Sequence, residues 1–405
     1  DYAKEQNITI RKNRITAVST QIDVKTAKAA LFPSLSFSTG QQVVNRPYQE
    51  TSSRVSGSEI ISSNSKTSYN GNYGLNASWT LYNGNKRLKT IQQEKLNNQM
   101  AELDVATSEN NIQESIAQVY IQILYAAESV KVNENTLQVS IAQRDRGQEL
   151  LNAGSIAKSD LAQLEAQVST DRYQLVTAQA TLEDYKLQLK QLLELDGENE
   201  MNIYLPALSD ENVLAPLPTK RDVYISALSL RPEIEASKLN VEASELGINI
   251  AKSSYFPTIS LSAGIGTNHT SGSDFTFGEQ VKNGWNNSIG LSVSVPIFNN
   301  RQTKSAVQKA KLQYETSMLS LLDEQKALYK TIESLWLDAN SAQQRYAAAN
   351  EKLKSTQISY ELISEQFNLG MKNTVELLTE KNNLLQAQQE QLQAKYMAIL
   401  NTPLL

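Results

Sequence analysis

The chain has 405 residues, of which 38 are basic and 43 acidic, and its formal net charge is -5. It contains no cysteine and one histidine, His269. This excludes disulfides and a cysteine nucleophile, and it disfavours a histidine metal cluster or a Ser-His triad. Neither half is strongly basic, so we expect no nucleic-acid binding. We therefore predict a protein without catalytic activity, cofactor or bound metal.

The first half is predicted to run helix, strand, loop, strand, long helix and return helix. It begins inside a helical pattern and lacks a signal peptide, so we expect a mature or trimmed chain. The first helix, Thr9–Phe32, should stop before Pro33, because the residue before a proline disfavours helical geometry. The elements that follow are strands at about 34–43 and 69–82, a long helix at about 86–150 and a return helix at 155–195.

The second half repeats this order after a linker at 196–220, which holds three of the nine prolines. Its expected elements are a helix at 223–256, strands at about 258–266 and 287–298, a long helix at about 301–369 and a return helix at 373–400. Both long helices lack glycine and proline, the strongest helix breakers. With a rise of about 1.5 Å per residue they reach about 90–100 Å. Such lengths are typical of coiled coils or tubular assemblies.

The chain is an internal duplication of a first repeat, 1–195, and a second repeat, 221–405. Three segments match between the repeats, with an offset of 224 residues for the first pair and 216 for the others. They are Ala27–Gly40 with Ala251–Gly264, Gly74–Asn85 with Gly290–Arg301, and Leu150–Leu161 with Gln366–Leu377. So long a period indicates a duplicated structural unit and not a solenoid repeat.

The four strand segments alternate apolar residues with small polar ones. At 287–298, for example, Ile289 and Leu291 alternate with Gly290 and Ser292. A period of two predicts strands with one apolar face. Serine, glycine and asparagine on the other face suit the water-filled interior of a membrane β-barrel, and about 9–11 residues suffice to cross the membrane. The alternative interpretation is an ordinary antiparallel sheet with flexible hairpin loops.

A membrane barrel cannot be closed by four strands, because known barrels have about eight or more. Open sheet edges in lipid leave backbone groups without hydrogen bonds, at a cost of several kcal/mol each. The chain must therefore share its barrel with copies of itself. Two copies would give eight strands and an interior filled by side chains, whereas three would give twelve strands and a lumen. We predict a homotrimer with a 12-stranded barrel.

The last long helix carries an apolar seam whose steps of three and four residues indicate left-handed supercoiling against neighbours. Its members include Leu328, Ile332, Leu335, Ala339, Ala342, Tyr346, Ala349 and Leu353. The other faces are rich in glutamine, asparagine, serine and lysine, as expected of a wall that is wetted on at least one side. The fold class we predict is mainly α, with the transmembrane β-barrel continued by a long α-helical barrel that the linker encircles.

The repeated boundary A-K-x-x-x-F-P, the four strands and the paired turns around Gly154 and Gly370 resemble the TolC-like outer-membrane efflux family. The resemblance covers essentially the whole chain. It implies a trimeric channel in the outer membrane of a Gram-negative bacterium, with a periplasmic tunnel and the outer-membrane lipid around its barrel. It also implies a passive conduit of a tripartite efflux or type I secretion system. The partners would be a periplasmic adaptor protein and an inner-membrane pump, either proton-driven or of the ABC type.

Each long helix ends at an Asn-x-Gly turn, where glycine supplies a left-handed backbone conformation. Ser159 and Asn373 are candidate caps of the return helices. A helical hairpin alone would explain the glycines. By resemblance, both turns would also lie at the periplasmic mouth and contact the adaptor. The contacting residues would be Gly154, Ser155, Ile156, Ala157, Gly370, Met371, Lys372 and Asn373.

The resemblance further implies a periplasmic gate, at the positions Asp160, Phe367, Lys372, Glu376 and Thr379. Three copies of Glu376 would form an acidic ring that favours cations and raises their own pKa by repulsion. Thr379 stands where a second acidic residue is common, so a double ring is in doubt. Phe367 lacks the hydroxyl that a Tyr–Asp hydrogen bond needs. The alternative is that Glu376 is a solvated carboxylate at a helix start.

A competing prediction is a soluble periplasmic coiled-coil scaffold without channel activity, whose strands form a small packing domain. The alternating faces and the duplicated Phe-Pro boundary argue against it. An adaptor protein would carry a single helical hairpin between β-rich domains, and no constellation of residues supports an enzyme of cell-wall metabolism.

Overall fold

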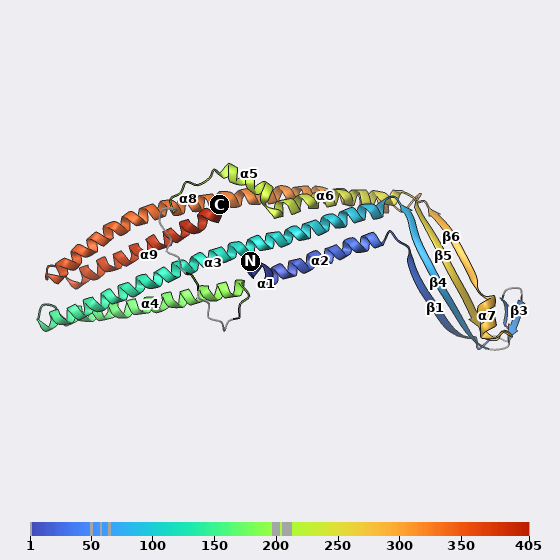
Figure 1. The fold of residues 1–405 in the computed structure, drawn as a ribbon, viewed down its shortest axis with the longest axis horizontal. Coiled ribbons are helices and arrows are strands. Elements are labelled where there is room, and N and C mark those ends of the chain that lie inside the picture. Colours follow the sequence, from blue (N-terminus) through green and yellow to red (C-terminus); the bar gives the residue numbers. More distant parts are fainter. Residues whose placement is uncertain are drawn as a thin grey trace. The chain divides into compact units, whose positions relative to one another are not determined.

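A computed structural model describes residues 2–48, 52–56, 59–63, 66–196, 203–204 and 213–404. The protein is mostly helical and contains one four-stranded sheet (Figure 1). Its residues form two compact units. One unit comprises 1–15, 102–235 and 322–405, and the other comprises 16–101 and 236–321. Most of the linker expected at 196–220 lies outside the described residues.

The second unit contains the sheet, which is antiparallel with the order β1-β4-β5-β6. Its strands are β1 Ser34–Asn45, β4 Thr67–Asn83, β5 Thr258–Thr270 and β6 Asn286–Ser294. The central pair, β4 and β5, joins the two halves of the chain. The strands β1 and β6 each have one neighbour in the sheet, so each leaves one edge unpaired in the single chain.

The register places the apolar residues of all four strands on one face. One row across the sheet is Leu35, Ala77, Ala263 and Ile289, and the next row on the other face is Ser36, Asn76, Gly264 and Ser288. The apolar face is solvent-exposed in the single chain. Its exposed fractions reach 69% at Leu35, 68% at Phe37 and 83% at Ile289.

Hydrogen bonds from β4 and the start of α3 hold the passage from helix to strand at Phe32-Pro33. The indole N–H of Trp79 donates to the Leu31 carbonyl at 2.7 Å. The Arg87 guanidinium donates to the Ala30 carbonyl at 2.8 Å and to the carbonyl of Thr80. These bonds satisfy carbonyls that the end of a helix leaves free.

Both loops between paired strands contain structure that the sequence analysis did not predict. The first holds the hairpin of β2, Ser52–Ser56, and β3, Glu59–Ser63. The second holds helix α7, Phe277–Asn283, which the Thr276 hydroxyl caps while the Glu279 carboxylate accepts from the Thr276 N–H at 2.8 Å. This Thr-x-x-Glu capping box is a signal that the sequence carried.

The prolines change two of the expected elements. The helix predicted at 223–256 is divided into α5, Lys220–Leu230, and α6, Pro232–Lys252. The division occurs because Arg231, which precedes Pro232, is extended with ψ of 119°. The strand predicted at 287–298 ends at Ser294, two residues before Pro296, because proline cannot donate to the ladder.

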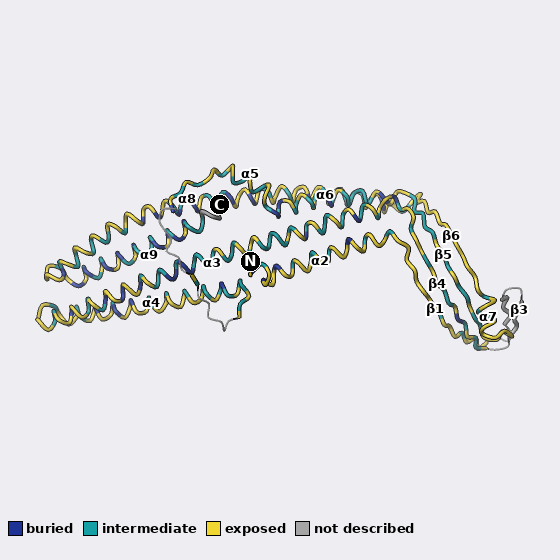
Figure 2. Tube along the Cα trace, in the orientation of Figure 1, coloured by how far each residue is buried: buried dark blue, intermediate teal, exposed yellow. Residues whose placement is uncertain are grey.

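The first unit contains two helical hairpins. Helix α3, Lys86–Asn152, returns through α4, Lys158–Leu192, and helix α8, Gln302–Asn368, returns through α9, Thr374–Leu404. The helices α1, Tyr2–Gln6, and α2, Ile8–Ala29, precede them in the chain. Buried residues form narrow stripes along these hairpins and leave the remaining faces open (Figure 2). None of the helices described here is apolar and long enough to span a membrane.

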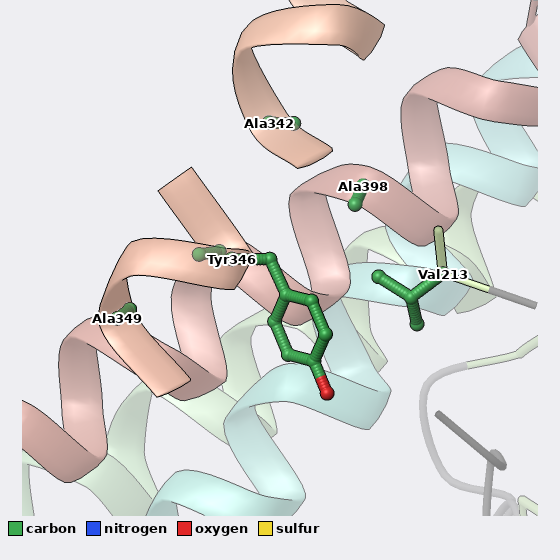
Figure 3. Close-up of a cluster of buried hydrophobic side chains, with 6 residues drawn as sticks. Val213, Ala342, Tyr346, Ala349 and Ala398 are labelled. Carbon is green, nitrogen blue, oxygen red and sulfur yellow. The ribbon is translucent and has the colours of Figure 1, made fainter. Parts of the chain in front are cut away.

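The end of the linker is packed onto α8 and α9. Val213 is 1% exposed and lies beside Tyr346 and Ala398 (Figure 3). The indole N–H of Trp336 donates to the Pro218 carbonyl at 3.1 Å. At the equivalent position of the first repeat, the Tyr120 hydroxyl donates to the Tyr204 carbonyl at 2.8 Å. Both aromatic residues thus anchor linker backbone.

Candidate functional site

The turn between α3 and α4 ends its helix with two backbone hydrogen bonds. Gly154 has φ of +71°, and its N–H donates to the Leu151 carbonyl at 2.9 Å. The Ser155 N–H donates to the Leu150 carbonyl at 2.8 Å. No atom lies within 4 Å of where a Cβ on Gly154 would stand, so the glycine is needed for its backbone conformation and not for space.

The turn between α8 and α9 repeats this geometry. Gly370 has φ of +73°, and its N–H donates to the Phe367 carbonyl at 2.9 Å. The Met371 N–H donates to the Gln366 carbonyl at 2.8 Å. The same pattern of bonds is found at residues 216 positions apart, so the two turns are structurally equivalent.

The starts of the two return helices are capped differently. Helix α4 begins at Lys158 with Ala157 at the N-cap, so the candidate cap Ser159 is wrong. There the Asp160 carboxylate accepts from the Ala157 N–H at 3.1 Å. Helix α9 has a side-chain cap, because the Asn373 amide oxygen accepts from the Glu376 N–H at 2.9 Å.

Glu376 completes the cap of α9 and forms an ion pair. Its carboxylate accepts from the Asn373 N–H at 3.2 Å and from the Lys372 ammonium at 2.5 Å. Hydrogen bonds from Lys372 and from the Asn373 backbone lower the pKa of Glu376 in the single chain. Its side chain remains 40% exposed, so the carboxylate is charged and accessible at neutral pH.

The remaining predicted gate residues do not converge within one chain. Phe367 is 4% exposed. The Thr379 hydroxyl donates to the Val375 carbonyl at 2.8 Å. Lys372 is bound to Glu376, and no hydrogen bond between the described residues joins Asp160 to Lys372.

The predicted tip residues differ in exposure between the two turns. At the second turn, Met371 is 70% exposed, and its neighbour Leu369 is 74% exposed. At the first turn, Gly154, Ser155 and Ala157 are exposed while Ile156 is partly covered. The second turn therefore presents the larger apolar surface.

Sequence analysis missed a buried polar cluster formed by Ser140 of α3, Asp171 of α4 and Lys381 of α9. Lys381 lies between the buried residues Leu377 and Leu384, and Asp171 follows the buried residues Leu164 and Val168. Steps of three and four residues put both charges on apolar seams. A charged residue at a seam position was therefore the signal in the sequence.

Among the residues described, no group of three or more histidine, aspartate or glutamate side chains is arranged to hold a metal ion. The titratable groups at the two turns lie at the ends of helices, where they act as caps and ion-pair partners. Such an arrangement can bind a partner or select ions by charge.

Comparisons with known proteins identify the family. The family described as Outer membrane efflux protein matches residues 1–194 and 223–400. The outer membrane efflux protein BepC of Brucella suis is 24% identical over 290 residues, which are 71% of this chain and 60% of BepC. The outer membrane protein TolC of Escherichia coli is 24% identical over 294 residues, 70% of this chain and 58% of TolC. The chain thus spans about 60% of the length of these relatives.

The fold is also that of a solved outer membrane protein. The crystal structure of VceC from Vibrio cholerae has a TM-score of 0.81 to this structure. The match covers 99% of this chain and 93% of VceC at 15% sequence identity. Together with the family match over both repeats, these findings show that the chain belongs to the outer membrane efflux protein family.

Proposed function

We propose that the chain is one protomer of a homotrimeric outer-membrane channel, a passive conduit of a tripartite efflux or type I secretion system that catalyses no reaction. The observation that carries this proposal is the sheet β1-β4-β5-β6, with its exposed apolar face, its uncharged polar face and its two unpaired edges. A soluble sheet would bury its apolar face in a core.

The unpaired edges support assembly from copies. In the single chain β1 and β6 each leave one row of backbone groups without strand partners. In lipid such groups must be satisfied, because each unpaired group costs several kcal/mol. Pairing β6 of one copy with β1 of the next removes every edge once the ring closes. Three copies give the 12 strands that leave a lumen.

The two faces support the direction of the sheet in this barrel. Ile289, Leu291 and Val293 would face lipid, and the row of Ser36, Asn76, Gly264 and Ser288 would face the lumen. This polar row carries no charge, and it offers hydroxyl and amide groups to water and to solutes. The barrel lumen would therefore discriminate little by charge.

The two turns suit contact with a periplasmic adaptor protein that connects the channel to an inner-membrane pump. Contact would be made by residues 154–157 and 370–373, of which Met371 offers the largest exposed apolar side chain. Exposed apolar side chains rimmed by polar groups are typical of protein-binding surfaces. The pump is either proton-driven or of the ABC type.

The gate would be built from Glu376 of three protomers. Because each Glu376 is paired with its own Lys372, the ring would consist of three ion pairs and not of three bare carboxylates. Substitution Glu376→Gln would then leave three unpaired lysines and shift selectivity from cations toward anions. Unchanged selectivity and current in planar bilayers would remove Glu376 from the gate.

The channel proposal is tested by two variants at neighbouring residues of β6. Lysine on the lipid face costs about 2–4 kcal/mol at the membrane midplane, so Ile289→Lys should abolish assembly in the membrane. Ser288→Lys places the same charge on the lumen face and should keep the trimer while shifting conductance toward anions. Native mass spectrometry and bilayer recording give the two results. A chain that stays folded and monomeric in buffer without detergent would contradict the proposal.

A further inference from the structure

A buried charge cluster connects three helices of the first unit. Ser140 and Asp171 are 2% exposed, and Lys381 is 3% exposed. The Lys381 ammonium donates to the Asp171 carboxylate and to the Ser140 hydroxyl, and the Ser140 hydroxyl donates to the same carboxylate oxygen, Oδ2. The cluster thus joins the α3–α4 hairpin to α9.

The surrounding hydrogen bonds complete the cluster. The second carboxylate oxygen of Asp171, Oδ1, accepts from the Gln167 amide at 2.8 Å. The same amide approaches the Asn382 side-chain oxygen at 3.3 Å. Burial lowers the pKa of Lys381, whereas its hydrogen bond to the Asp171 carboxylate and the charge of that group oppose the shift. Both oxygens of Asp171 are therefore occupied when α9 is in this position.

The cluster lies close to the turns along each helix. Lys381 follows Glu376 by five residues, or about 8 Å of helix, and Asp171 follows Asp160 by eleven residues, or about 16 Å. A shift of α9 by one turn, about 5.4 Å, would withdraw Lys381 from Asp171 and leave two buried charges without partners. Intermediate positions are disfavoured, so the contact has a made state and a broken state.

A second ion pair of the first unit provides the contrast. Lys352 of α8 and Glu390 of α9 are 2.7 Å apart, but their side chains are 44% and 41% exposed. That pair lies within one hairpin and remains hydrated if it breaks. The Lys381–Asp171 pair, with 4% and 2% exposure, connects one hairpin to the other and is dry.

We propose that Ser140, Asp171 and Lys381 form a lock that holds α9 against the α3–α4 hairpin, and that its release allows α9 to move and widen the mouth surrounded by Glu376. This inference rests on the proposed function, because it assigns a means of regulation to the same conduit. Lys381 and Asp171 are positioning residues for the gate and do not themselves line it.

The test compares Asp171→Asn with Lys352→Met in the full-length trimer in planar bilayers. Asp171→Asn keeps the shape of the side chain and removes its charge, so the ratio of open to closed dwell times should rise roughly fivefold or more. Lys352→Met breaks the exposed pair and should leave this ratio unchanged. Equal dwell-time ratios in Asp171→Asn and the parent protein would overturn the lock.

A double variant separates the lock from a merely structural role. Asp171→Leu with Lys381→Met replaces the pair by apolar side chains, which commonly restores stability. We expect it to melt like the parent protein and still to show the raised open ratio. A double variant that recovers both the melting temperature and the closed state would show that the charges only stabilise the fold. It also serves if Asp171→Asn does not assemble.

A distance measurement distinguishes failure of the lock from failure of the channel. The chain has no cysteine, so spin labels can be placed at exposed Ala162 of α4 and Asn383 of α9, in trimers with one labelled protomer. We expect one distance in the parent protein and a second, longer one in Asp171→Asn. If the parent conducts no current while this second distance appears, the channel proposal fails and the lock stands. If the distances are unchanged, the lock fails whether or not the parent conducts.

Discussion

The two helical hairpins share one backbone design and differ in what fills it. Their turns have the same left-handed glycine, at φ of +71° and +73°, and the same pair of closing hydrogen bonds. The return helices differ at equivalent positions. Asp171 of α4 corresponds to Ala387 of α9, and the two are buried to 2% and 0% exposure. Lys381 of α9 corresponds to Glu165 of α4, which is exposed.

This difference shows that the hairpins complement each other and do not merely repeat. The acid of the buried pair comes from one hairpin and the base from the other. A perfect duplication would put like charges opposite each other, or no charges at all. The equivalence of the backbone and the difference of the side chains can be tested separately.

The largest effect is expected from Asp171→Ala, which leaves Lys381 buried without its partner. Breaking a buried pair costs about 3–5 kcal/mol, whereas an exposed substitution costs within about 0.5 kcal/mol. The control is Asp184→Ala, on the exposed face of the same helix. Thermal melting of the detergent-solubilised protein measures both, and equal melting temperatures would contradict the importance of the pair.

The next effect concerns what the two turns share. Alanine in the left-handed conformation costs about 1–2 kcal/mol, and an added Cβ meets no atom within 4 Å at either Gly154 or Gly370. Gly154→Ala and Gly370→Ala should therefore destabilise the protein to the same extent, as measured by denaturant unfolding. A large difference between the two variants would show that the turns are not equivalent.

A smaller effect separates the two helix starts. Asn373→Ala removes the side-chain cap of α9 and should cost about 1 kcal/mol. Ser159→Ala lies beyond the N-cap of α4 and should change stability by less than about 0.5 kcal/mol. The same unfolding measurement compares them, with Ser159→Ala as the control for Asn373→Ala.

The smallest effect is the pH dependence of the Glu376 cap. The pKa of Glu376 is lowered in the folded chain from its ordinary value of 4.5 by Lys372 and the Asn373 backbone. A lowered folded pKa stabilises the protein above the unfolded pKa, and this contribution is lost as the pH falls through the folded pKa. The stability difference between the parent protein and Glu376→Gln should therefore shrink below about pH 4.5. A difference that does not change with pH would contradict this assignment.

Much of the fold was predictable because its signals are local. The long helices follow from the absence of glycine and proline, the strands from their period of two, and the turns from Gly154 and Gly370. Helix α7 could have been predicted as well from Thr276 and Glu279. The misplaced cap at Ser159 shows the limit of such signals, because a serine near a helix start is a cap only in the right backbone position.

The sequence by itself determined the periodicities, the duplication and the breaks in the chain, since each depends on residues a few positions apart. Only the tertiary structure decided that Lys381 meets Asp171, 210 residues away, and that β4 pairs with β5 to unite the two repeats. The physical reason is that a charge on an apolar seam is stable only if a partner helix presents the opposite charge at the same level. That level is set by how the helices pack and not by any pattern within one of them.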